Sequence, residues 1–148
     1  MLNATARVFK NCAALAFCIA YVTQSMAQTE ARDELASKLS RRELQRSPSS
    51  IQGREIVQVV TEIPAGIESG WHAHPGEEIG YIIAGEVEMR IRGRVTVVLR
   101  AGDGFLIPPR TPHNARDLGP ETGRMLSTYL VETGQPLSTF VDQPVDRK

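Results

Sequence analysis

The sequence predicts an all-β fold, and three observations support this class. β-Branched residues gather in the second half of the chain, where apolar and polar residues alternate as they do in half-buried strands. Twelve glycines and nine prolines supply the tight turns that many short strands require. The length of 148 residues is enough for one hydrophobic core but not for two. We therefore expect a single all-β domain.

The expected strands follow one another from residue 55 onwards. In the segment 55–63, Val57, Val59 and Ile63 share one face while Gln58 lies on the other. The same reasoning marks further strands at 71–74, 78–84, 86–92, 95–99, 105–107, 113–117 and 125–131. Glycine and proline turns separate neighbouring strands, so short antiparallel pairs are expected.

The N-terminus has the pattern of a secretory signal peptide at residues 1–27. Arg7 and Lys10 give a positive start, 12–22 is apolar, and small residues allow cleavage after Ala27. The apolar run is shorter than the ~20 residues of a membrane-spanning helix. We expect a periplasmic or secreted protein that keeps no stable membrane anchor after cleavage.

Cleavage would change the chemistry of the remaining chain. Both cysteines, Cys12 and Cys18, lie in the predicted signal, so the mature chain would have neither a disulfide nor a thiolate ligand. It would keep 15 of the 17 basic residues against 17 acidic ones, without a basic block. This balance argues against a nucleic-acid partner.

Residues 28–50 are predicted to be a linker or arm with marginal helix. Leu35 and Leu39 are spaced as on one helix face, and Ser40 and Glu43 match a capping box that starts a short turn. Such an arm either packs across a partner subunit or is a solvated tether. The barrel domain is expected at 51–133 and a C-terminal tail that covers it at 134–148.

All three histidines of the chain, with one glutamate, form a candidate metal site. His72 and His74 are two residues apart, which places both imidazoles on one face of a strand. Glu78 follows, and His113 is available to complete the set. Glu77 points to the opposite face of its strand and fits the position of the carboxylate ligand less well. Imidazoles and a carboxylate are ligands of divalent transition metals, so we predict one such ion.

These residues resemble the first sequence motif of the cupin family. That motif is glycine, five residues, His-x-His, three or four residues, glutamate, six residues and glycine. The chain matches it at each position, with Gly66, His72, His74, Glu78 and Gly85.

The second cupin motif is matched in part. Gly102, Pro108 and His113 fit it, whereas Arg110 stands where a glycine is usual and Asp117 where an asparagine is usual. The resemblance covers about residues 51–131. It implies a small jelly-roll β-barrel that holds a metal through His113 and the three ligands of the first motif.

The resemblance also implies an open metal site beside a pocket. The metal is expected to be iron, manganese, nickel, copper, cobalt or zinc. Strand parity predicts small or apolar walls, with Gly80 leaving space over the metal: Gly80, Ile82, Ala84, Val87, Met89, Leu106 and Ala115. Asp117 is a candidate general base and Arg110 a candidate anion clamp at the rim. A structural salt bridge is the alternative role for Arg110.

Two functions from different classes follow. The first is an exported metal-dependent enzyme of the dioxygenase, isomerase or lyase kind, acting on a small organic molecule that chelates the metal through oxygen. The second is a protein that binds a metal or a small ligand without turnover. Because cupins often pair their barrels, we also expect a homodimer.

Overall fold

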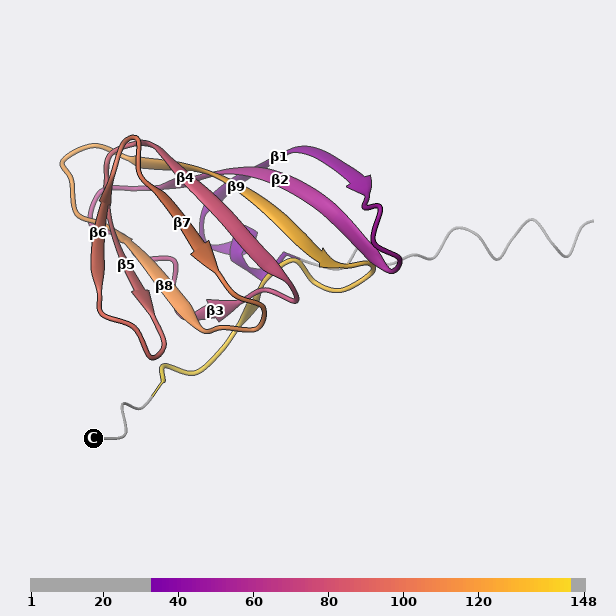
Figure 1. Ribbon diagram of the computed structural model, residues 1–148. Helices are drawn as coiled ribbons and strands as arrows, with labels where there is room; N and C mark the ends of the chain where they lie inside the picture. Colours follow the sequence, from indigo (N-terminus) through magenta and orange to yellow (C-terminus); the bar gives the residue numbers. More distant parts are fainter. Residues whose placement is uncertain (1–32, 145–148) are drawn as a thin grey trace, which may run out of the picture.

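The computed structural model describes residues 33–144, which form two antiparallel five-stranded sheets facing each other (Figure 1). The first sheet contains, in spatial order, β1 (Ser40–Pro48), β2 (Arg54–Ile63), β9 (Gly123–Glu132), β4 (Glu77–Ala84) and β7 (Gly104–Ile107). The second contains β10 (Thr139–Phe140), β3 (His72–Ala73), β8 (His113–Asp117), β5 (Glu86–Ile91) and β6 (Val97–Arg100). The predicted all-β class is thus confirmed.

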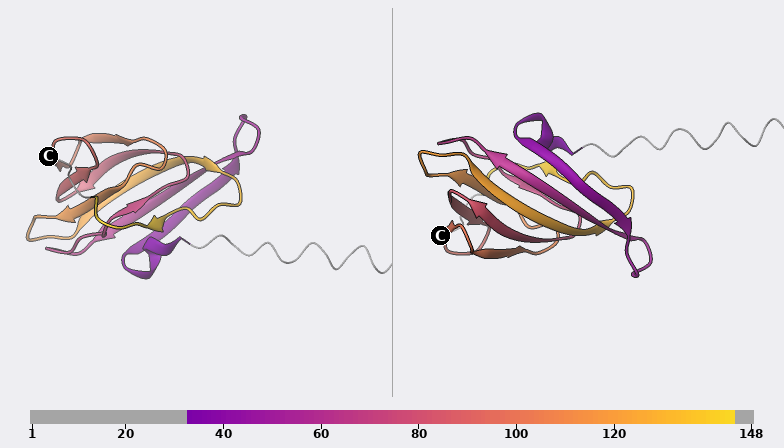
Figure 2. Two further views of the ribbon diagram at one scale, coloured as in Figure 1. Left: turned by 90° about the horizontal axis from the view of Figure 1, so that it is seen from below. Right: turned by 90° about the horizontal axis from the view of Figure 1, so that it is seen from above.

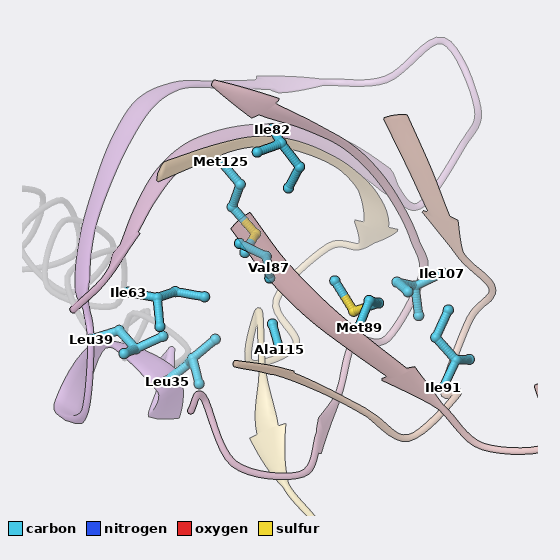
Figure 3. Packing of buried hydrophobic residues seen from close by; sticks show 10 residues of the cluster. All are labelled: Leu35, Leu39, Ile63, Ile82, Val87, Met89, Ile91, Ile107, Ala115 and Met125. Carbon is cyan, nitrogen blue, oxygen red and sulfur yellow. The ribbon is translucent and has the colours of Figure 1, made fainter. Parts of the chain in front are cut away.

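The core lies between the two sheets because their strands alternate inward apolar and outward polar residues. In β2 the buried positions are every second residue from Val57 to Ile63, as the sequence predicted. Figure 3 shows side chains from both sheets converging in the barrel, together with two leucines from the N-terminal segment. This cluster comprises Leu35, Leu39, Ile63, Ile82, Val87, Met89, Ile91, Ile107, Ala115 and Met125. Full burial of each large side chain contributes roughly 1.5–3 kcal/mol.

The helical turn predicted from Ser40 is wrong, because residues 40–48 form strand β1. This strand pairs antiparallel with β2 from Ser40 opposite Glu62 to Pro48 opposite Glu55, with a bulge after Glu43. Most of its side chains are exposed, so no alternation marks it in the sequence. Backbone hydrogen bonds to the edge of β2 therefore outweigh the local capping pattern.

A short helical segment precedes β1, as predicted, but it packs tightly. The 3₁₀ helix η1 covers Glu34–Ser37, and both Leu35 and Leu39 are buried in the core. Residues 33–50 therefore belong to the folded barrel and are not a solvated tether. The predicted signal peptide at residues 1–27 lies outside the described residues.

The C-terminal segment meets η1 at one end of the barrel (Figure 2). Leu137 and Ser138 are buried, and β10 adds a two-residue strand beside β3. The Leu35 amide donates to Ser138 Oγ over 3.0 Å, and the Phe140 amide donates to Glu34 Oε2 over 2.7 Å. The sequence predicted a tail that covers the barrel rather than adding to it, but the described part of this segment adds a strand to the second sheet. None of the helical structure in residues 33–144 has the length and apolar character that a membrane crossing demands.

Candidate metal centre

The three histidines converge inside the barrel. His72 on β3 and His113 on β8 are direct register partners, and His74 follows β3 by one residue. All three side chains are buried, and one potential ligand atom from each lies within 4.8 Å of the others. The structure therefore brings together the imidazoles that the sequence singled out.

Backbone carbonyls fix the orientation of each imidazole. Nδ1 lies 2.8 Å from the Gly70 oxygen in His72, 2.7 Å from the Leu137 oxygen in His74, and 2.9 Å from the Thr111 oxygen in His113. A carbonyl oxygen can only accept, so Nδ1 carries the proton in each ring. In a neutral ring the lone pair is then on Nε2, as metal ligation requires, and the carbonyl holds the ring in place.

The electrostatics favour a neutral imidazole at His72. Burial lowers the pKa of His72 well below its ordinary value, and the neighbouring rings of His113 and His74 lower it further. Because only the unprotonated nitrogen can bind a cation, the same environment prepares His72 for ligation.

Glu78 on β4 completes the cluster from the opposite sheet. Its Oε2 lies 3.1 Å from His74 Nε2 and 3.3 Å from His113 Nε2. Its Oε1 accepts hydrogen bonds from Ser127 Oγ at 2.6 Å and from Tyr129 Oη at 3.0 Å. Burial by itself would raise the pKa of Glu78, but the contacts with His74 and His113 hold it well below the usual range. Glu78 is thus a carboxylate with one oxygen fixed and one facing the imidazoles.

This donor set fits a divalent cation. The Nε2 atoms of His74 and His113 lie 3.1 and 3.3 Å from Glu78 Oε2, and a positive charge among these three atoms, such as a bound cation, stabilises the carboxylate. Metal–nitrogen bonds of ~2.0–2.1 Å place neighbouring ligand atoms about 3 to 3.4 Å apart. Within residues 33–144, His74 Nε2 is also a buried atom with no hydrogen-bond partner. The donors admit each of the six metals named above and do not choose among them.

Glu77, the alternative carboxylate, lies outside the cluster. Its side chain is partly exposed and its Oε2 is 3.5 Å from Arg54 Nη1. Since successive residues of a strand point to opposite faces, Glu78 faces inward and Glu77 does not.

A small cavity adjoins the cluster, with about 10 Å³ in which the centre of a water molecule could lie. One part of its wall is polar and includes two of the histidines and Glu78, and the other part is apolar. The lining residues are Leu35, Leu39, Arg41, Thr61, Ile63, Ser69, His72, Glu78, Met89, His113, Ala115 and Met125. Two of the predicted wall residues, Met89 and Ala115, are among them.

Other predicted wall residues lie elsewhere in the barrel. Ile82 and Val87 are fully buried in the core, and Ala84 is half-buried, but none of them lines the cavity. The alternation of inward and outward positions along the strands correctly predicted that Ile82 and Val87 point into the barrel. Ile82 lies four residues along β4 from Glu78, about 13 Å at the rise of a β-strand, and this separation keeps it away from the metal cluster.

The predictions for Gly80 and Leu106 are wrong. A side chain at Gly80 would meet the ring of Phe105, its register partner on β7, so Phe105 fills the predicted space. Leu106 is 50% exposed because its neighbour Ile107 occupies the inward position. In both cases the register of β7 against β4 decides which side chain enters the barrel.

Asp117 does not lie at the cavity. It is buried on the same strand as His113, but four residues further along, which is about 13 Å at the rise of a β-strand. Its Oδ1 accepts from the Gly119 amide over 3.1 Å, and its Oδ2 faces Gly123. Asp117 is therefore not placed to act as a base on a ligand bound near the histidines.

Arg110 is also remote from the cavity. Its exposed guanidinium pairs with Glu132 over 2.6 Å, so the structural salt bridge is the role observed. The backbone of Arg110 has φ 54°, the left-handed conformation that glycine adopts most easily. The arginine thus takes the conformation of the glycine that the second cupin motif usually has. The Arg110 amide donates to the His74 oxygen over 2.8 Å and ties this loop to the cluster.

Three polar residues at the site did not emerge from the sequence. Ser127 and Tyr129 hold Glu78, and Arg41 reaches the cavity from β1. A signal for the first two exists, because they share the inward face of β9 with Met125 and Val131. Arg41 gave no such signal, since its strand was predicted to be a linker.

The fold and this centre define the class of protein: a two-sheet β-barrel in which three imidazoles and one carboxylate converge beside a cavity. The family model of the cupin domain (Cupin_2) matches residues 59–129. The match spans most of the barrel and includes all four clustered side chains. Together with the fold, it supports assignment of the chain to the cupin superfamily.

Two curated proteins are similar to parts of the chain. The dimethylsulfoniopropionate lyase DddQ of Ruegeria pomeroyi is 40% identical over 61 residues, which are 41% of this chain and 30% of that enzyme. The polyketide synthase CurC of Streptomyces cyaneus is 30% identical over 94 residues, which are 53% of this chain and 60% of that protein. The chain therefore spans less than two thirds of the length of either relative.

Solved structures share the fold. An uncharacterized protein with a double-stranded β-helix domain from Klebsiella pneumoniae superposes with a TM-score of 0.60 at 22% identity. The match covers 77% of this chain and 92% of that one. At this level of identity the likeness establishes the architecture alone.

Proposed function

We propose that the protein is a metal-dependent enzyme of the lyase type that acts on a small organic molecule bound to the metal through oxygen. The observation that carries the proposal is the arrangement of Glu78, whose Oε1 is held by Ser127 and Tyr129 while Oε2 faces the Nε2 atoms of His74 and His113. The 40% identity to a lyase over 61 residues favours this class over a dioxygenase or an isomerase.

The chain supplies the ligands, the orientation and the enclosure for such a reaction. His72, His74, Glu78 and His113 would hold a divalent cation, which would act as a Lewis acid on a substrate oxygen. Because the Nδ1 atoms are anchored to backbone carbonyls, the Nε2 atoms keep their positions when a substrate enters.

Tyr129 and the apolar wall have separate roles in this proposal. Burial and the charge of Glu78 raise the pKa of the Tyr129 hydroxyl. The hydroxyl therefore stays protonated and donates a hydrogen bond to Glu78 Oε1. Leu35 and Leu39 close the cavity at the η1 end and limit the access of water.

Elemental analysis of protein purified without chelators tests the metal site. We expect one divalent metal ion per chain in the wild type, and loss of the metal in His74→Ala. The matched control is Glu77→Ala, which removes a carboxylate next to Glu78 on the outward face and should keep the metal. Retention of full occupancy in His74→Ala would contradict the assignment.

Substrate turnover tests the reaction class. The metal-loaded protein is incubated with a panel of small hydroxy acids, enols, catechols and sugar acids, and substrate loss and oxygen uptake are followed together. A lyase splits the substrate into two products without consuming oxygen, whereas a dioxygenase consumes oxygen and an isomerase gives a single product. Activity that persists in the metal-free His74→Ala variant would refute a metal-dependent enzyme. A metal-bound protein that is silent against the whole panel would favour the alternative of a binding protein without turnover.

Export and dimer formation are part of the same proposal. Export is supported by the signal-like sequence at 1–27, and mass spectrometry of the mature chain should show Gln28 as the first residue. Dimer formation is supported by three exposed apolar side chains that lie together on β4 and β7, namely Ile79, Tyr81 and Leu106. Sedimentation should give the mass of two chains, and a mass of one chain would contradict it.

A further inference from the structure

A buried arginine shares the cavity with the proposed metal ligands. Arg41 belongs to β1, yet its side chain is only 3% exposed and lines the cavity. Its Nε donates to Asp33 Oδ2 over 2.6 Å, Nη1 to Thr61 Oγ1 over 3.1 Å, and Nη2 to Tyr129 Oη over 3.2 Å. The plane of the guanidinium is thereby fixed by three partners.

The guanidinium retains hydrogen-bonding capacity. An arginine has five N–H groups, and residues 33–144 accept from three of those of Arg41. One N–H on Nη1 and one on Nη2 remain for a ligand. A pair of adjacent N–H groups matches the two oxygens of a carboxylate.

Arg41 is also coupled to the metal cluster through one hydroxyl. Tyr129 Oη accepts from Arg41 Nη2 and donates to Glu78 Oε1. A small molecule in the cavity therefore lies between the imidazoles on one side and the guanidinium on another. The remaining wall is apolar and comes from leucine, isoleucine and methionine side chains.

The charges at the cavity favour a ligand with one negative charge. Glu78 in the wall and Asp33, the ion-pair partner of Arg41, contribute two negative charges, whereas Arg41 and a divalent cation would contribute three positive ones. Buried charges are stable when they are balanced, so a monoanion would complete the set.

We propose that Arg41 determines substrate specificity by pairing with a carboxylate, so that the substrate is a small monocarboxylic acid with a second oxygen for the metal. This inference rests on the proposed metal-dependent function and names the substrate class for that site. Arg41 contacts the carboxylate, while the apolar wall accepts the short carbon chain.

A matched pair of probes tests the inference by binding rather than by turnover. Protein loaded with Mn²⁺ is titrated calorimetrically with 2-hydroxypropanoate and with 2-hydroxypropanamide, which differ in charge but not in shape. Charge-assisted hydrogen bonds predict that the wild type binds the acid at least about tenfold more tightly than the amide. Arg41→Gln should weaken binding of the acid at least about tenfold and leave the amide unchanged.

Arg46→Gln is the control, since Arg46 lies on the same strand and pairs with Glu43 and Glu55 outside the cavity. It should bind both probes as the wild type does. The manganese content of every variant is measured in the same samples. An Arg41→Gln protein that keeps the acid preference would overturn the inference, because the metal alone would then select the anion. Loss of manganese from this variant would also overturn it, by showing that Arg41 supports the metal site instead.

If Arg41→Gln does not fold, Arg41→Lys decides the question. Lysine keeps the charge but cannot offer two parallel N–H groups, so binding of the acid should weaken several-fold while the amide is unaffected. Unchanged affinity for the acid would refute the role of the guanidinium. A wild type that binds acid through Arg41 but turns over nothing would contradict the proposed enzyme and leave this inference standing. Turnover in which the preference for the acid does not depend on Arg41 would support the proposed enzyme and overturn this inference.

Discussion

His72 and His113 face each other across β3 and β8 as register partners, with their ring centroids 4.1 Å apart. The two rings are tilted by 54° and are both buried. Two protonated imidazoles at this separation would repel each other. The pairing therefore favours the neutral form of His72 and makes the stability of the metal-free protein dependent on pH.

The first prediction is that the metal-free protein becomes less stable as the pH falls below about 6.5. The unfolded chain protonates His72 near its ordinary pKa, whereas the folded chain does so only well below it. Between these values the unfolded state binds more protons, so acidification favours unfolding, by up to about 1.4 kcal/mol per pH unit for this one proton. Glu78, whose pKa is also lowered in the folded chain, adds a further loss in more acidic solution.

Urea denaturation of chelator-treated protein at several pH values measures this effect. The His72→Gln variant is the control, because it lacks the titrating imidazole and should lose less stability over the same interval. Equal slopes for the variant and the wild type would show that His72 does not contribute.

The second prediction concerns the hydrogen bond from Ser127 to Glu78. Ser127→Ala removes a buried donor at 2.6 Å from a carboxylate, which should cost about 1.5–3 kcal/mol and leave Oε1 held by Tyr129 alone. Metal affinity should fall roughly 10- to 100-fold, as it does when groups that orient ligands are removed. Competition with a chelator measures the affinity. Thr128 is the next residue on β9 and faces outward, so the Thr128→Ala variant should bind metal as the wild type does. If Ser127→Ala also binds metal normally, Ser127 does not orient Glu78.

The third prediction concerns the contact between Gly80 and Phe105. A methyl group at Gly80 would lie 2.0 Å from the Phe105 ring, so Gly80→Ala should destabilise the barrel by about 1–3 kcal/mol. Phe105→Leu in the same chain should recover part of the loss, because the smaller side chain vacates that position. Thermal unfolding measures both. A methyl group at Gly104 would make only an ordinary contact at 3.5 Å, so Gly104→Ala should cost less stability than Gly80→Ala. An equally small cost for Gly80→Ala would mean that the Phe105 ring moves aside freely.

The fourth prediction concerns the N-terminal segment. Leu35 is 2% exposed and lies in the core and the cavity wall, so Leu35→Ala should lower the free energy of unfolding by about 2–5 kcal/mol. Leu44→Ala on β1 is the control, since Leu44 is 42% exposed and should change stability by less than about 1 kcal/mol. Urea titration distinguishes them. Equal small effects would show that η1 is not an integral part of the fold.

How much of the site could be predicted depended on how local its signals are. The two-residue spacing of His72 and His74 and the parity of Glu78 are properties of one strand and its turn, so the chain order alone predicted an inward-facing cluster. His113 came from the motif spacing, and its pairing with His72 follows from sheet closure.

The failures share one cause. β1 has almost no buried side chain to mark it, and its existence depends on hydrogen bonds to β2. Leu106, expected in the pocket wall, faces outward because the register of β7 on β4 sets the inward face. Sequence parity cannot supply such a register.

The sequence by itself determined the all-β class and the local ligands His72, His74 and Glu78, because strand alternation and ligand spacing are local properties of the chain, and the second motif added His113. Only the tertiary structure decided what surrounds that set. Arg41, Thr61 and Tyr129 meet in one hydrogen-bonded group because β1, β2 and β9 are neighbours in the sheet, although they are distant in the chain. Contacts of this kind depend on which strands pair and in which register, and those are settled when the whole barrel closes.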